Sequence, residues 1–153
     1  MIEPISAIII FIFKKTVASV SSKGVVTIKG YGIAIINVRA ASTSRYTAAS
    51  KKITIKVLPK KQGIVLCKSK KSGTFDIKWK KDSKIAGYQI VYSTNSNFKN
   101  HKAVRVSAGK KVTKRVTGLK KGKKYYVKVR SYIRIGNKNY YGKYSSVAKV
   151  RVK

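Results

Sequence analysis

Acidic residues are the scarcest charged residues in this chain. Its 153 residues include three carboxylates, Glu3, Asp76 and Asp82, against 37 lysines and arginines, and the formal net charge at pH 7 is +34. General acid–base and glycosidase chemistry uses paired carboxylates. Asp76 is expected to face solvent from a strand and Asp82 to lie in the loop that follows, so the sequence predicts no such pair. We therefore expect a protein that is not an enzyme.

The chain also has only one cysteine and one histidine. A lone Cys67 cannot form an internal disulfide. One cysteine, one histidine and three acids cannot complete a closed zinc site or a calcium cage. We expect Cys67 to be a small core residue and His101 to lie in a surface loop, and we predict no metal and no cofactor.

No apolar run is long enough to cross a bilayer as a helix, which takes roughly 20 residues. A secretory signal places positive charge before its apolar stretch and a small-residue cleavage site after it. The apolar residues 5–13 instead follow Glu3 and precede Lys14 and Lys15. We predict neither a membrane span nor a signal peptide. We expect a buried or edge strand here, or the start of a chain whose upstream portion is missing.

Basic residues are abundant, and most of them are lysine: 30 lysines and seven arginines. A charge balance of this kind favours polyanionic partners. Proteins that read nucleic-acid sequence use arginine for bidentate contacts, so the excess of lysine favours a diffuse positive field over specific readout. Hydrophobic content of 43% is typical of a folded protein.

Large apolar residues alternate with polar ones from residue 73 onward, in the runs 75–79, 87–92 and 125–129. This alternation predicts strands with one buried and one wet face, at the spacing of an all-β sandwich. A tyrosine that begins a strand after an arch between sheets can hydrogen-bond back to the upstream backbone. The expected core residues are Trp79, Tyr88, Ile90, Leu119, Tyr125, Val127 and Val129.

These positions resemble the fibronectin type III consensus, which runs Trp, Tyr-x-hydrophobic-x-Tyr, then Leu-x-Pro-x-Thr-x-Tyr-x-Val-x-Val. Lys121 and Lys123 replace the Pro and Thr, so the framework alone matches. The sequence of residues 87–98 and 140–145 resembles the subtype of this domain that is found in surface proteins of Gram-positive bacteria. The resemblance implies a fibronectin type III-like domain over residues 64–153.

Residues 17–58 form a second β unit in this interpretation. A hairpin through Gly24 joins residues 17–20 to 25–28, and residues 33–38 and 53–57 are strands. The segment from Val17 to Ile28 resembles part of the bacterial immunoglobulin-like group 2 (Big2) domain. Such domains usually carry about two more strands ahead of this segment. The fold class is therefore all-β, with two tandem immunoglobulin-like β-sandwiches. The first is truncated, or residues 5–13 supply its missing edge; residues 1–16 are an atypical apolar segment and residues 59–63 a linker.

Cations and aromatic residues alternate on the wet face of the strand at residues 125–132. Such a face can hold anionic groups while its rings stack on sugars or bases. The alternative is that lysine is simply the solvated residue of outer strand faces, where it also discourages edge pairing. The candidate polyanion- or glycan-facing residues are Tyr126, Lys128, Arg130, Tyr132, Lys120, Lys121, Lys123 and Lys124.

The sequence thus predicts a non-catalytic extracellular or cell-surface spacer or adhesion module, the C-terminal part of a larger bacterial surface protein. Its lysines would hold it to anionic wall polymers by counterion release. The alternatives are a carbohydrate-binding accessory module of a secreted hydrolase and a basic protein that binds nucleic acid without sequence specificity.

Overall fold

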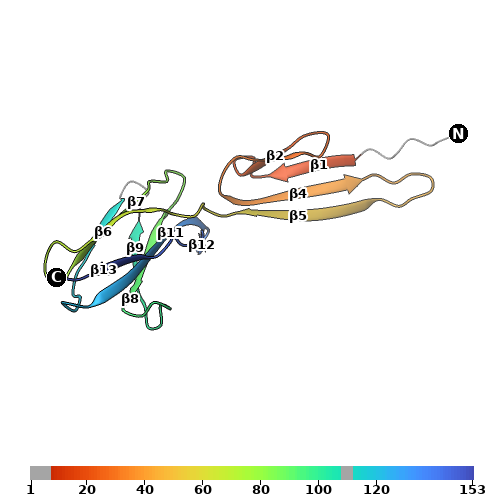
Figure 1. The fold of residues 1–153 in the computed structure, drawn as a ribbon. Helices are drawn as coiled ribbons and strands as arrows, with labels where there is room; N and C mark the ends of the chain where they lie inside the picture. Colours follow the sequence, from red (N-terminus) through yellow and green to blue (C-terminus); the bar gives the residue numbers. More distant parts are fainter. Residues whose placement is uncertain (1–7, 108–111) are drawn as a thin grey trace. The chain divides into compact units, whose positions relative to one another are not determined.

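The computed structural model describes residues 8–107 and 112–153. Within these ranges the chain forms strands and no helix, which confirms the all-β prediction. The chain divides into two compact units, one ending at Val57 and the other running from Leu58 to Lys153 (Figure 1).

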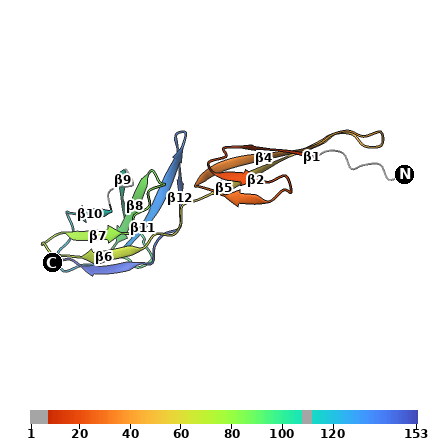
Figure 2. The ribbon, with the colours of Figure 1, turned by 90° about the horizontal axis from the view of Figure 1, so that it is seen from above.

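The first unit is built on an antiparallel sheet with the strand order β1-β4-β5, beside a β2–β3 hairpin (Figure 2). Gly24 has a φ of +79° in the hairpin turn, where a residue without a Cβ fits best. The strands are β1 (Ile8–Phe13), β2 (Ala18–Val20), β3 (Val26–Ile28), β4 (Gly32–Ala40) and β5 (Ala49–Val57).

β1 is an edge strand that pairs with β4 over its whole length. The core of the first unit is small: Val17, Ala18 and Ala34 form a buried cluster against which Ile12 and Val57 pack, and Ile36 is also buried. Large apolar side chains remain exposed, among them Ile8 (60%), Phe11 (56%) and Phe13 (59%). This unit buries much less apolar surface than a complete sandwich would.

The second unit consists of two antiparallel sheets that face each other. One has the order β10-β7-β6, and the other has the order β12-β11-β8-β9, with β13 also paired to β11. The long β11 pairs with β13 along its first residues and with β12 along its last. The strands are β6 (Ile64–Lys68), β7 (Phe75–Trp79), β8 (Gly87–Ser93), β9 (Lys102–Ser107), β10 (Thr113–Val116), β11 (Lys124–Ile135), β12 (Lys138–Tyr141) and β13 (Ala148–Arg151).

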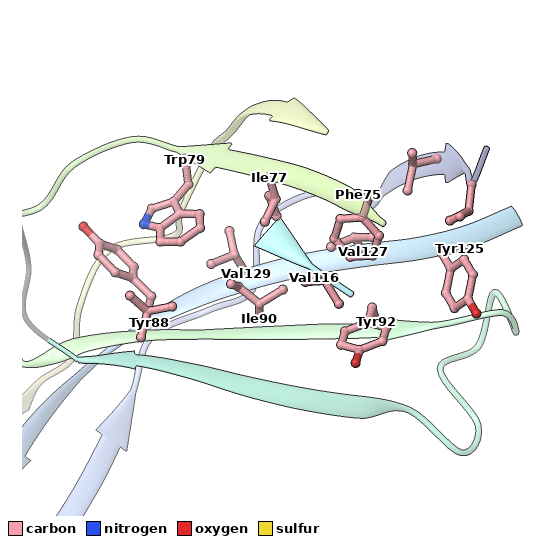
Figure 3. Packing of buried hydrophobic residues seen from close by; sticks show 13 residues of the cluster. Phe75, Ile77, Trp79, Tyr88, Ile90, Tyr92, Val116, Tyr125, Val127 and Val129 are labelled. Atoms are coloured by element: carbon pink, nitrogen blue, oxygen red, sulfur yellow. The ribbon is translucent and has the colours of Figure 1, made fainter. Parts of the chain in front are cut away.

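Alternate side chains of β7, β8 and β11 fill the space between these sheets (Figure 3). The rings of Trp79 and Tyr88 lie 5.1 Å apart, and those of Phe75 and Tyr92 meet edge to face at 5.7 Å. Burying each such side chain stabilises the fold by about 1.5–3 kcal/mol. Of the core residues expected from the sequence, six are buried and Leu119 is partly buried against them.

Residues 59–63, which were predicted as a short linker, pack on the second unit. Pro59 and Gln62 are buried, and the Gln62 amide donates to the Ser131 hydroxyl at 3.3 Å. The backbone of Pro59 lies so close to Gly142 that a Cβ there would sit 2.4 Å from the Pro59 carbonyl oxygen. The glycine therefore permits this close approach of two segments.

Candidate polyanion-binding surface

The loop before β11 is tied to the core through Tyr125. The backbone N–H of Lys120 donates to the Tyr125 hydroxyl at 3.1 Å, which is the backward hydrogen bond expected of a sandwich arch. The Tyr125 ring is buried and lies 6.4 Å from Phe75 and 6.2 Å from Tyr92. The core thus fixes the backbone that carries the loop lysines.

The last strand adds further anchors to the same loop. The N–H of Gly122 donates to the Val152 carbonyl at 2.8 Å, and the N–H of Val152 donates to the Lys123 carbonyl at 3.0 Å. The Arg151 guanidinium donates to the Gly122 carbonyl at 2.9 Å. Gly122 turns the chain with a φ of +75°. The loop is therefore held on both sides of its turn.

An open groove lies where this loop meets the end of β8 and the start of β9. Its volume is about 530 Å³, within the range of pockets that bind small ligands. The buried rings of Tyr92 and Tyr125 and the partly buried Leu119 line it. Its polar lining includes Lys102, Lys120, Lys123, Lys124, Thr94 and Asn100.

Hydrogen bonds also fix the opposite wall of the groove. The Ser93 hydroxyl donates to the Lys99 carbonyl at 2.9 Å and accepts from the N–H of Asn95 at 3.0 Å. The Asn95 side chain in turn accepts from the N–H of Asn97 at 2.8 Å. Both walls are thus set by hydrogen bonds within the second unit.

The two aspartates of the described residues are engaged away from the groove, and neither lines it. Asp76 binds Arg115 through two hydrogen bonds, at 2.7 and 3.0 Å, on the β10-β7-β6 sheet. The hydrogen bond from the Arg115 guanidinium is the main cause that lowers the pKa of Asp76. Asp82 accepts from the N–H of Lys84 at 3.0 Å in the loop before β8. The groove therefore keeps a concentrated positive charge.

Two cations also face each other across strands beside the groove. Lys124 on β11 is the register partner of Arg151 on β13, and both are exposed. Like charges directly opposite each other on a sheet are destabilising. A bound anion would relieve this repulsion.

Cations and rings on the outer face of the second sheet are paired with each other. The Lys128 ammonium lies 3.8 Å from the ring centroid of Phe98 and 4.5 Å from that of Tyr144. The Arg130 guanidinium lies 3.9 Å from the Tyr141 centroid and 4.3 Å from that of Tyr144. We call these five residues the cation–aromatic ladder. Burial is the main cause that lowers the pKa of Lys128, and the nearby Arg130 charge lowers it further.

The prediction that Tyr132 offers an exposed ring on this face is wrong. Tyr132 does continue the outward alternation of β11, but its exposure is only 3%. Its ring packs 5.6 Å from that of Tyr141 on β12. It also lies over Gly87, where a Cβ would clash with its hydroxyl at 2.7 Å. Tyr132 is therefore unavailable to a sugar or a base, whereas Tyr126 is partly exposed.

The structure separates the predicted surface residues into two groups. Lys120, Lys123 and Lys124 line the groove, and Lys121 is exposed in the same loop without lining it. Lys128 and Arg130 belong to the ladder on the sheet face. The sequence interpretation missed Lys102, Thr94, Asn100, Phe98 and Tyr144, because only the fold brings them to these sites. The polar run 93–100 between two strands was the available signal.

The remaining reactive side chains do not assemble into a site. Cys67 is partly buried against the core, and burial raises the pKa of its thiol to about 11. His101 is exposed, with its Nδ1 3.0 Å from the Phe98 carbonyl oxygen. Among the residues that the structure describes, no three of the histidine, cysteine and acidic side chains come together as metal ligands.

Over residues 8–107 and 112–153 there is no helix with the length and apolar character needed to cross a bilayer.

Comparisons with known proteins give a family and a fold. Residues 61–148 match the family model of the fibronectin type III domain. A structure titled as a myokine is 14% identical, with a TM-score of 0.50 over 61% of this chain and 97% of that one. The crystal structure of chicken CNTN1 FN1-FN3 domains is 18% identical, with a TM-score of 0.54 over 83% of this chain and 47% of that one. A comparison with curated proteins gives no match.

At such identities the two solved structures show the fold alone. The family match is stronger evidence, because it covers more than half of the chain and contains the aromatic framework of the second sandwich. This chain belongs to the fibronectin type III family.

Proposed function

We propose that the chain is a non-catalytic spacer and adhesion module of a bacterial surface protein, and that its lysines hold it to anionic wall polymers. Fibronectin type III domains are commonly extracellular spacers or binding modules without catalytic activity. The resemblance of residues 87–98 to modules of Gram-positive surface proteins supports the bacterial and cell-surface part of the proposal.

The observation that carries the proposal is the convergence of four lysines on one groove that neither aspartate of the described residues lines. The loop backbone that carries three of them is fixed by the bond from Lys120 to Tyr125, so that backbone needs little further ordering on binding. A polyanion that neutralises these charges releases its condensed counterions, a driving force described for nucleic acids. The net charge of +34 extends the same attraction over the rest of the chain.

In this proposal residues 17–58 are a partial Big2-like unit and residues 64–153 the fibronectin type III-like domain. The first unit serves as a spacer. Its charges are also basic, and a pocket of about 560 Å³ lined by Arg39, Lys51 and Lys52 adds to the positive field.

The test is sedimentation with insoluble peptidoglycan sacculi, before and after chemical removal of their anionic polymers, over a series of salt concentrations. We expect binding to intact sacculi that weakens steeply with salt and is lost from stripped sacculi. Equal binding to stripped sacculi would contradict the proposal and favour recognition of the glycan itself.

A further inference from the structure

We infer that the groove between the β8–β9 and β10–β11 loops holds one phosphodiester group of a linear phosphate polymer without aromatic bases. The inference rests on the proposed function and makes it more specific. It assigns a discrete subsite with a defined ligand chemistry to a surface that would otherwise attract any polyanion.

The charged lining of the groove is suited to an oxyanion. Among the residues that the structure describes, all four charged side chains that line the groove are lysines. The arginine fork matches planar, bidentate partners among both carboxylates and phosphates, whereas lysine acts as a compact point charge with three rotatable donors and also binds phosphate. Several lysines around one groove can therefore surround a tetrahedral oxyanion. Phosphate and sulfate groups both have this geometry.

The rings at the groove argue against a nucleic acid. Proteins that bind single strands stack successive bases on exposed aromatic faces. Tyr92 and Tyr125 line the groove, but only 7% and 8% of their surfaces are exposed, and their rings pack in the core. The ladder rings on the sheet face are likewise covered by Lys128 and Arg130. The groove thus offers charge without a stacking platform.

The neutral lining suits a polyol between phosphates. Thr94 and Asn100 are exposed at the groove and supply a hydroxyl and an amide beside the lysines. Hydroxyl groups of a glycerol or similar linker can both donate to and accept from such groups. Charged and neutral polar groups therefore lie together in the groove, as the phosphates and hydroxyls of a polyol phosphate chain would require.

A pair of triple variants of the full chain tests the assignment. K120Q/K123Q/K124Q removes three groove charges. K78Q/K81Q/K84Q removes three exposed charges near the other end of β8, roughly 20 Å away along the strand. Both variants have the same net charge. Thermal melts verify that both remain folded.

The probe is a synthetic oligo(glycerol phosphate), with binding measured by calorimetry at several salt concentrations. We expect the groove variant to lose about tenfold or more in affinity and the control variant less than about threefold. The log–log salt slope should fall by about 1 in the groove variant, because the one phosphate held in the groove contributes somewhat less than one.

The possible failures are distinguishable. Equal losses in the two variants would overturn the groove and leave the proposed function intact. Tighter wild-type binding to a sulfated oligosaccharide or to oligo(dT) of equal charge would overturn the phosphodiester assignment. Absence of wild-type binding to every polyanion would overturn the proposed function as well.

Discussion

The backbone N–H of Lys120 donates to the hydroxyl of Tyr125 at 3.1 Å, and this bond joins the hydrophobic core to the basic groove. Tyr125 buries its ring between the sheets while its hydroxyl fixes the loop that presents the lysines. One side chain thus serves both the stability of the sandwich and the geometry of the candidate site.

Replacing Tyr125 by Phe should lower the free energy of unfolding by about 1–3 kcal/mol. The ring would stay in the core, but the N–H of Lys120 would lose its partner in a partly buried place. Urea titration measures the change. Tyr126→Phe is the matched control, because the neighbouring Tyr126 is only partly buried on the opposite face of β11. Similar losses in the two variants would contradict the anchoring role.

The cation–aromatic ladder should show measurable coupling between Lys128 and Tyr144. The ammonium lies 4.5 Å from the ring centroid, and cation–π contacts of this kind contribute about 0.5–1 kcal/mol. A double-mutant cycle with Lys128→Met and Tyr144→Leu measures the coupling in the free energy of unfolding. A second cycle with Lys78→Met, on the other sheet, should give none. An equal coupling free energy in the two cycles would contradict a specific contact between Lys128 and Tyr144.

Alternation along the chain is sufficient to place Phe75, Ile77 and Trp79 in the core, because the period of two follows from strand geometry alone. The backward bond of Tyr125 was predictable for a similar reason, since it depends on a local arch. These features are set by neighbours in the sequence.

The burial of Tyr132 was not predictable from alternation. Its ring faces outward as expected, but Tyr141 packs against it and Gly87 leaves room beneath it. The groove depends in the same way on distant segments, because Lys102 and Lys120 lie on different loops. Contacts between such segments are decided by tertiary packing, which a one-dimensional pattern does not contain.

The thiol of Cys67 should react slowly in the folded protein. Burial raises its pKa to about 11, so its thiolate fraction at pH 8 is about 100-fold smaller than that of an ordinary cysteine. Ellman's reagent at pH 8 measures the rate, and full denaturant should restore the rate of a free thiol. Rapid reaction without denaturant would show that the β6 core contact is not maintained.

Acid should weaken the second unit through Asp76. Arg115 holds the pKa of this carboxyl below its usual value, so the pair stabilises the fold above the unfolded pKa, near 4. This contribution is lost as the pH falls through the lower folded pKa. We expect the wild type to lose more stability than Asp76→Asn between pH 5 and pH 2. The difference should be small, because the pair is largely exposed. Parallel profiles of unfolding free energy against pH for the wild type and Asp76→Asn would contradict this prediction.

Amide chemical-shift mapping of the full chain during titration with oligo(glycerol phosphate) locates the anion-binding surface directly. If the polymer binds in the groove, salt-sensitive shifts should concentrate at residues 93–102 and 118–125, with the β10-β7-β6 sheet little affected. Shifts spread evenly over the exposed lysines, or centred on a surface away from the groove, would contradict binding in the groove.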